Sequence, residues 1–132
     1  MDKIVIEHLN LKYQDGTESL RDVNLTIAAN AITVLFGPAG SGKSSLLRVL
    51  NRLNDRSDVA ALTGKVLLNG QNILDPEVNP VELRRKVGIV FSRPVPLPLT
   101  IYENVAYGLR LMGENRKDRL DQAVEQALRE AV

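Results

Sequence analysis

Eight residues in the first third of the chain combine the glycines, the lysine and the hydroxyl groups that phosphate binding needs. They run Gly37-Pro38-Ala39-Gly40-Ser41-Gly42-Lys43-Ser44 and fit the pattern G-x-x-x-x-G-K-[ST]. The glycines let successive backbone N–H groups point toward one anion. The Lys43 ammonium is expected to reach the β- and γ-phosphates, and the Ser44 hydroxyl to ligate Mg²⁺. The pattern predicts a P-loop, and we include the next residue, Ser45, in the nucleotide site.

The flanking sequence supplies the elements that a P-loop requires. The apolar run Ala31–Phe36 predicts a buried strand that leads into the motif. A helix is predicted to follow over Ser45–Leu53, starting near Lys43, with its positive N-terminal end directed at the anion. Its inner face should carry Leu46, Leu47, Leu50 and Leu53.

Two strands are predicted before this core. Ile4–Tyr13 alternates with period two, and its parity changes across Glu7-His8, which indicates a bulge. After the turn signal Asp15-Gly16, Val23–Ile27 alternates again and should pair antiparallel to the first strand.

The second half of the chain alternates turn signals with short periodic segments. Asn54–Thr63 is expected to be a loop, and Gly64–Ile73 a hairpin that turns at Asn69-Gly70. Val81–Lys86 should be a short basic helix and Val87–Phe91 a buried strand. The final predicted elements are a helix capped by Thr100 that runs to about Leu111 and is ended by Gly113, and a helix from Arg116 onward with one apolar stripe (Leu120, Ala123, Val124, Ala127, Leu128, Val132).

Four further features have both a functional and a structural interpretation. Tyr13 could be an aromatic platform for an adenine ring, although a tyrosine on a strand is more often a packing residue. His8, the one histidine, is interpreted as structural. The run Arg84-Arg85-Lys86 is interpreted as a solvated helix face. The proline-rich segment 93–99 is either a loop that contacts a partner or a plain connector.

Composition narrows the class of protein further. The 132 residues carry a formal net charge of +1, so we expect no nucleic-acid partner. The absence of cysteine excludes disulfides, thiolate metal sites and a cysteine nucleophile. The N-terminus does not read as a signal peptide, and no run reaches the ~20 apolar residues that span a bilayer.

Together these features resemble the ATP-binding subunit of an ABC transporter, most closely the phosphate-importer branch. Tyr13 stands at the place of the adenine-stacking A-loop, and Gly37–Ser44 at that of Walker A. The similar stretches are Asn30–Pro38, Leu46–Asp55, Leu83–Phe91 and Ile101–Gly108. The resemblance covers almost all of this chain and is to the N-terminal half of such an ATPase.

The resemblance implies an α/β fold that contains part of a P-loop NTPase core. An antiparallel β region would comprise residues 1–30 and 64–75, the P-loop core residues 31–54 and 87–91, and the start of a helical subdomain residues 100–132. It also implies ATP and Mg²⁺ as ligands, with Ser92 at the position of the Q-loop glutamine, where serine is too short to reach as far toward the metal.

The implied partners are transmembrane permease subunits, contacted through residues 92–104, and a second ATPase subunit. The implied place is the cytoplasmic face of the cell membrane, and the implied role is phosphate import. The family's signature, Walker B and later motifs have no counterpart in this sequence, so we expect nucleotide binding without turnover from these residues alone. We also expect exposed strand edges to favour self-association.

Two alternatives remain open at this stage. One is a non-catalytic nucleotide-binding or interaction module, natural or engineered. The other is a small P-loop kinase, in which the P-loop strand usually opens the chain; here two strands and Tyr13 precede it.

Overall fold

The computed structural model describes all 132 residues and divides into two compact units. The first unit comprises Met1–Ile89 and the second Val90–Val132. None of the helices is long and apolar enough to cross a membrane.

The first unit is built on an antiparallel sheet of four strands in the order β2-β1-β3-β4. The strands are β1 (Asp2–Tyr13), β2 (Glu18–Ala28), β3 (Val59–Leu68) and β4 (Gln71–Asn72). The predicted turn at Gly16 joins β1 to β2, and the predicted Asn69-Gly70 turn joins β3 to β4; both glycines have a positive φ, of 88° and 83°. The hairpin predictions are therefore confirmed, although β1 and β2 are longer than the alternating residues indicated.

The predicted irregularity at His8 is a bulge that involves three neighbouring strands. His8 and Asp22 both have left-handed backbones, with φ of 49° and 46°. The side chain of Asn10 donates to the His8 carbonyl and accepts from the Asp22 N–H, each at 2.8 Å. On the third strand Gly64 has a φ of 101° and lies directly against the backbone of β1. Nδ1 of the exposed His8 ring forms a hydrogen bond with Oδ1 of Asp22 at 2.7 Å. This contact agrees with the structural role predicted for His8.

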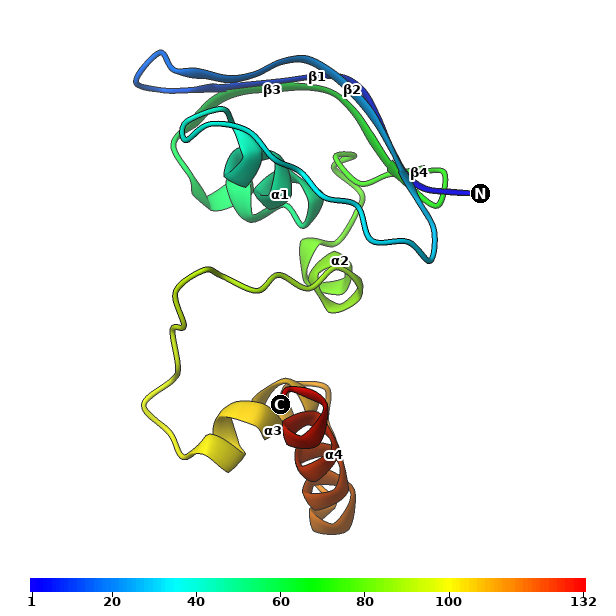
Figure 1. The fold of residues 1–132 in the computed structure, drawn as a ribbon, viewed down its shortest axis with the longest axis vertical. Helices are drawn as coiled ribbons and strands as arrows, with labels where there is room; N and C mark the ends of the chain where they lie inside the picture. The colour runs from blue at the N-terminus through cyan, green and yellow to red at the C-terminus, as the bar shows by residue number, and fades with distance from the viewer. The chain divides into compact units, whose positions relative to one another are not determined.

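Two α-helices and a 3₁₀ turn accompany the sheet, which arches over α1 (Figure 1). They are α1 (Lys43–Leu50), η1 (Leu53–Arg56) and α2 (Pro80–Lys86). Apolar side chains of the sheet, α1 and α2 form one core, whose buried members are Ile6, Leu9, Leu11, Leu20, Leu46, Val49, Val66, Ile73 and Leu83. This core fixes α1, and with it the P-loop, against the sheet.

The two predicted buried strands do not form. Residues 31–36 lead into the P-loop without strand structure, and Ile32 and Phe36 are 96% and 89% exposed. The segment Val87–Phe91 is likewise outside any strand, with Val90 98% exposed. The backbone N–H and C=O groups of a parallel strand need neighbours on both sides. Neither segment pairs with a strand of the one sheet in this structure, so their apolar sequence alone does not bury them.

Two smaller predictions are also wrong. Leu47 is 50% exposed, whereas Val49, which was not assigned to the inner face of α1, is fully buried. The expected loop 54–63 contains η1 and the first residues of β3, which pair with the end of β1. Pairing with β1 supplies the hydrogen bonds that decide strand structure there, despite the polar, mixed sequence.

Arg84 is not part of a solvated face. Its guanidinium donates to the carbonyl oxygens of Asn51 and Arg52, at 3.1 and 2.6 Å, just after α1 ends. Arg52 in turn donates to the carbonyl of Val78 at 2.8 Å. The last carbonyls of a helix lack internal partners and attract cations. Arg84 therefore ties α2 to the C-terminal end of α1, while Arg85 is exposed as predicted.

The second unit begins with a segment that has no helix or strand and continues into two helices that pack side by side (Figure 1). They are α3 (Ile101–Leu111) and α4 (Lys117–Glu130), with Ala106, Leu120 and Val124 buried between them. Thr100 and Glu103 form a full capping box, which confirms the predicted start of α3. The remaining members of the predicted stripe on α4 are not buried; Leu128 is 43% exposed.

The Glu114 carboxylate, in the turn that precedes α4, gives this unit a predictable pH dependence. Hydrogen bonds from the side chain and the backbone N–H of Arg116, with Arg119 nearby, lower the pKa of Glu114 to about 2. Because this pKa lies below the usual 4.5, the ionised group stabilises the fold above pH 4.5, and the contribution disappears as pH falls toward 2. Glu114→Gln should therefore speed amide hydrogen exchange in α4 at pH 7.

The control for this prediction is Glu125→Gln on the same helix. Glu125 makes only an exposed pair with Arg129, and such pairs contribute little. Its effect at pH 7 should be much smaller, and the Glu114→Gln effect on stability should vanish near pH 2. An equal effect of the two variants at neutral pH would contradict the assignment.

Candidate functional site

The P-loop motif forms a turn that ends at the first residue of α1. Gly40 and Gly42 have φ of 77° and 88°, in the left-handed region that favours glycine. Gly42 is the N-cap residue of α1, and no side chain caps the helix. The first turn contains no acidic residue. The free N–H groups at this end and the positive pole of the helix are therefore available to an anion.

Gly42 is also required by the close packing of the loop against β2. A Cβ atom at this position would lie 2.4 Å from the carbonyl oxygen of Ser19 and 3.1 Å from Cδ2 of Leu20. Real side chains do not approach a backbone oxygen so closely, so only glycine fits here. The loop is thus held against the edge strand of the sheet by contact with its backbone.

The Lys43 ammonium folds back over the loop. Its Nζ donates to the carbonyl oxygens of Gly37 and Pro38, at 2.8 and 2.6 Å, and to Oγ of Ser41 at 3.2 Å. These acceptors are neutral, whereas a phosphate oxygen carries negative charge and would attract the ammonium more strongly. The lysine is therefore positioned on the loop with acceptors that an anionic ligand can replace.

Tyr13 lies at the end of β1 and reaches the same helix. Its hydroxyl is 3.0 Å from Oγ of Ser45, which also accepts a hydrogen bond from Oγ of Ser19 at 2.8 Å. The Tyr13 ring packs partly against the core and also lines a surface hollow of about 410 Å³ with Gln14, Asp15, Ser57 and Asp58. Tyr13 is thus both a packing residue and an accessible ring near the P-loop.

Sequence reasoning missed Ser19. Nothing in the pattern of β2 distinguishes a serine 26 positions before Ser45, because the contact depends on how the hairpin packs on α1. Its one sequence signal, alternation extended back from Val23, is interrupted by the bulge at Asp22.

The residues that could contact Mg²⁺ are few. The Ser44 hydroxyl is on an exposed residue at the start of α1. The structure contains no cluster of three or more histidine, aspartate or glutamate side chains that could hold a metal ion. Mg²⁺ commonly takes most of its ligands from phosphate oxygens and water. A single donor, the Ser44 hydroxyl, fits a metal ion that is bound mainly by a nucleotide and water and takes one ligand from the protein.

Ser92 lies in the exposed segment that begins the second unit. The proline-rich residues that follow have no helix or strand, and the Asn104 side chain holds their end against α3. Asn104 accepts from the N–H of Leu97 at 2.8 Å and donates to the carbonyls of Leu97, Leu99 and Thr100 at 3.0–3.1 Å. The segment is therefore ordered at its C-terminal end while Val95 and Leu99 stay exposed.

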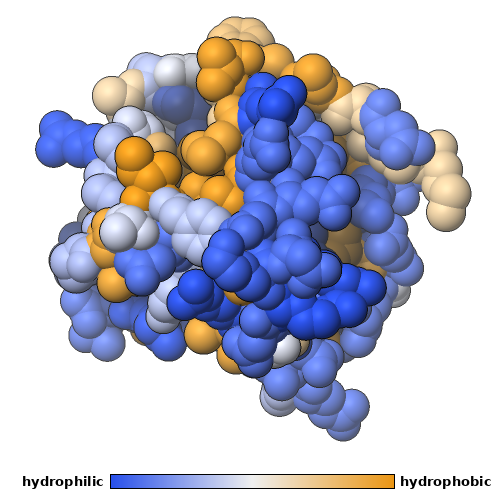
Figure 2. Space-filling model, turned by 90° about the horizontal axis from the view of Figure 1, so that it is seen from below, coloured by the Kyte–Doolittle hydropathy of each residue, from blue (hydrophilic) through white to orange (hydrophobic).

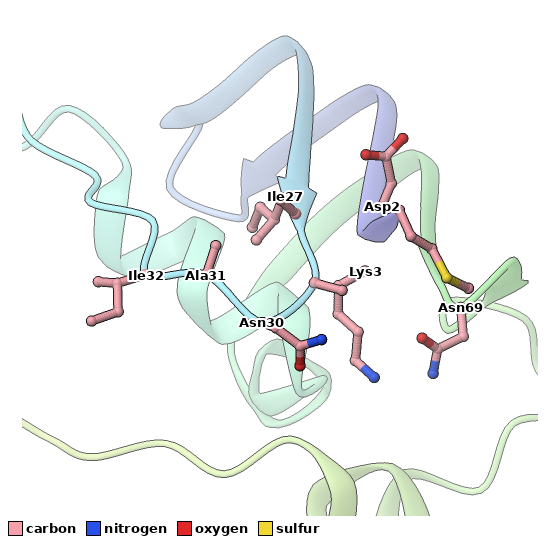
Figure 3. A pocket seen from close by; sticks show the side chains of 10 residues that line it. Asp2, Lys3, Ile27, Asn30, Ala31, Ile32 and Asn69 are labelled. Carbon is pink, nitrogen blue, oxygen red and sulfur yellow. The ribbon is translucent and has the colours of Figure 1, made fainter.

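A second hollow, of about 570 Å³, lies where β1 begins and β2 ends (Figure 3). Asp2, Lys3, Asn30 and Asn69 line it together with the exposed Ile32. None of the residues of the predicted nucleotide site lines this hollow. It carries no arrangement of side chains with an evident chemical role.

A family model described as ABC transporter matches residues 20–131. The chain therefore belongs to the ABC transporter family. The antiparallel sheet, the P-loop and the four helices are part of the ATPase domain of that family, as the sequence predicted.

The most similar curated relatives include phosphate import ATP-binding proteins. The PstB protein of Colwellia psychrerythraea is 52% identical over 127 residues, which is 96% of this chain and 45% of the relative. PstB 1 of Vibrio parahaemolyticus is 49% identical over 98% of this chain and 47% of the relative. The chain thus spans about half the length of the curated relatives it matches.

Two solved structures extend the comparison to the fold. CbiO1 of Clostridium perfringens, part of the ABC transporter complex cbiONQ, matches 97% of this chain and 49% of its own with a TM-score of 0.77 and 28% identity. A bacterial Atm1-family ABC exporter with ATP bound matches 81% of this chain and 18% of its own, with a TM-score of 0.68 and 31% identity.

Proposed function

We propose that this chain binds Mg²⁺-ATP as part of the ATPase subunit of an ABC importer, and that the imported substrate is phosphate. The observation that carries the proposal is the geometry of the P-loop. The Lys43 ammonium donates hydrogen bonds to two carbonyl oxygens of the loop, and the Tyr13 hydroxyl is hydrogen-bonded to Ser45 in the first turn of α1. Phosphate as the substrate rests on the similarity to the PstB relatives, which are phosphate import ATP-binding proteins. ATP is supported by the ATP-bound state of the related exporter.

In this proposal the triphosphate enters the loop and Lys43 exchanges its neutral carbonyl acceptors for phosphate oxygens. Residues Gly37 to Ser45 surround the phosphates, with backbone N–H groups supplying most of the donors. The adenine ring stacks on the accessible part of Tyr13. Mg²⁺ bound with the nucleotide would supply positive charge that neutralises the phosphates.

Ser44 is the protein ligand that we assign to Mg²⁺. We assign Ser92 to the position at which the family senses the γ-phosphate, with a side chain short for direct coordination. Within the chain, residues 1–30 and 64–75 would form the antiparallel β region, 31–54 and 87–91 the P-loop core, and 100–132 the start of the helical subdomain.

We further propose that residues 92–104 contact transmembrane permease subunits at the cytoplasmic face of the membrane, and that a second ATPase subunit completes the assembly. Large apolar side chains remain exposed along the chain, and Figure 2 shows hydrophobic residues at the surface among hydrophilic ones. In and beside the proposed contact region these include Val95, Leu97, Leu99 and Ile101, the last 74% exposed. Exposed apolar groups of this kind favour protein contacts.

Calorimetric titration of the purified chain with Mg²⁺-ATP tests the proposed function. We expect saturable binding, and we expect Tyr13→Ala to weaken it by about 1–2 kcal/mol because base stacking is lost. Inorganic tripolyphosphate has no base, so its affinity should be unchanged by Tyr13→Ala. The matched control is Tyr107→Ala on α3, which should alter neither affinity. Equal weakening of both ligands by Tyr13→Ala would exclude the adenine platform.

A further inference from the structure

Three hydroxyl groups from three different elements meet beside the P-loop. Tyr13 ends β1, Ser19 stands near the start of β2, and Ser45 lies in the first turn of α1. The Ser45 oxygen is 2.8 Å from Oγ of Ser19 and 3.0 Å from the Tyr13 hydroxyl oxygen. Ser45 is thus the shared partner of a tyrosine and a serine that do not belong to the P-loop motif.

The geometry makes this arrangement specific. A serine hydroxyl has one proton to donate and can accept two, so these bonds use a large part of what Ser45 can form. All three residues are partly buried, where a hydrogen bond is less readily exchanged for one to water. The backbone of Ser19 is also packed so closely on Gly42 that Ser19 has little freedom to move away from the loop.

We propose that Ser19 is a positioning residue for nucleotide binding: through Ser45 it holds the Tyr13 ring at a set distance from the P-loop. A nucleotide contains both a base and phosphates. It binds best when the base subsite and the phosphate subsite are already at the right distance from each other. A polyphosphate uses the P-loop alone and does not depend on the tyrosine. Ser19 therefore selects for ligands that carry a base. This inference rests on the proposed function.

Titrations with Mg²⁺-ATP and with Mg²⁺-tripolyphosphate test the inference on the full chain. Ser19→Ala should weaken ATP about fivefold, the usual value of one net hydrogen bond, and tripolyphosphate less than about twofold. Thr26→Ala removes an exposed hydroxyl with no side-chain partner from the same strand, so neither affinity should change.

Tyr13→Phe provides a second, independent test because it keeps the ring and removes only the hydroxyl. It should reproduce the selective loss of ATP affinity, and the double variant with Ser19→Ala should lose little more than either single variant. If circular dichroism shows that Ser19→Ala is unfolded, Tyr13→Phe alone decides the matter, because the double variant carries the same Ser19 substitution.

Three results would overturn the inference. They are an equal loss of both ligands in Ser19→Ala and in Tyr13→Phe, no loss in either variant, or losses that multiply fully in the double variant. Failure of the proposed function itself has a different signature. In that case the unmodified chain does not bind ATP, or Lys43→Ala binds ATP as well as the unmodified chain does. Either result rejects the proposed function and the inference about Ser19 together.

Discussion

Gly64→Ala is expected to lower the free energy of unfolding of the first unit by at least about 3 kcal/mol, or to prevent its folding. The backbone of Gly64 has a φ of 101°, which L-residues rarely adopt. A Cβ atom there would lie 2.4 Å from the carbonyl oxygen of His8 and 2.7 Å from that of Glu7. These are backbone atoms of the bulge in β1, so no side chain can move aside to make room.

Gly70→Ala separates the two causes of this destabilisation. Gly70 also has a left-handed backbone, with φ of 83°, but nothing lies within 4 Å of its added Cβ atom. It should cost only about 1 kcal/mol, the strain of the backbone alone. Urea unfolding followed by circular dichroism, with hydrogen exchange of the β1 amides, measures both. A loss in Gly64→Ala no larger than in Gly70→Ala would show that the sheet accommodates the clash.

Lys43→Ala is the second large effect and should weaken both ATP and tripolyphosphate by at least about 100-fold. The ammonium makes three contacts on the loop, and each charge-assisted bond that it would transfer to phosphate contributes about 1.5–3 kcal/mol. At about 1.4 kcal/mol for each tenfold change, two such bonds account for the expected loss. Calorimetric titration of each ligand measures it.

Lys65→Ala is the matched control. Lys65 is exposed on β3 and has no side-chain hydrogen bond or ion pair, so this variant makes the same change of net charge without touching the loop. Both ligands should bind to it as before. Lys43→Arg keeps the charge, but its planar fork differs from an ammonium, so we expect it to restore little of the affinity. Equal losses in Lys43→Ala and Lys65→Ala would indicate general electrostatic attraction rather than a phosphate site.

The features that the sequence by itself determined are those whose causes are local. Gly16 and Gly70 specify turns because the chain there needs a positive φ, and Thr100 specifies the start of α3 because its side chain accepts a hydrogen bond from a backbone N–H of the first turn. The spacing of Gly37, Gly42 and Lys43 identifies the P-loop because the conformation of this loop also depends on residues close together in the sequence. Such interactions link residues a few positions apart, so they can be predicted from the sequence without knowledge of the tertiary structure.

The tertiary structure decided what depends on contact between distant segments. Ser19 acquires its role only because β2 packs on α1, and Arg84 stops being a surface charge because α2 brings it to the end of that helix. The apolar run 31–36 shows the converse, since hydrophobic sequence alone does not bury a strand. A strand is stable where neighbouring strands pair with its backbone groups, and this requirement is met by β1, β2 and β3 but not by residues 31–36.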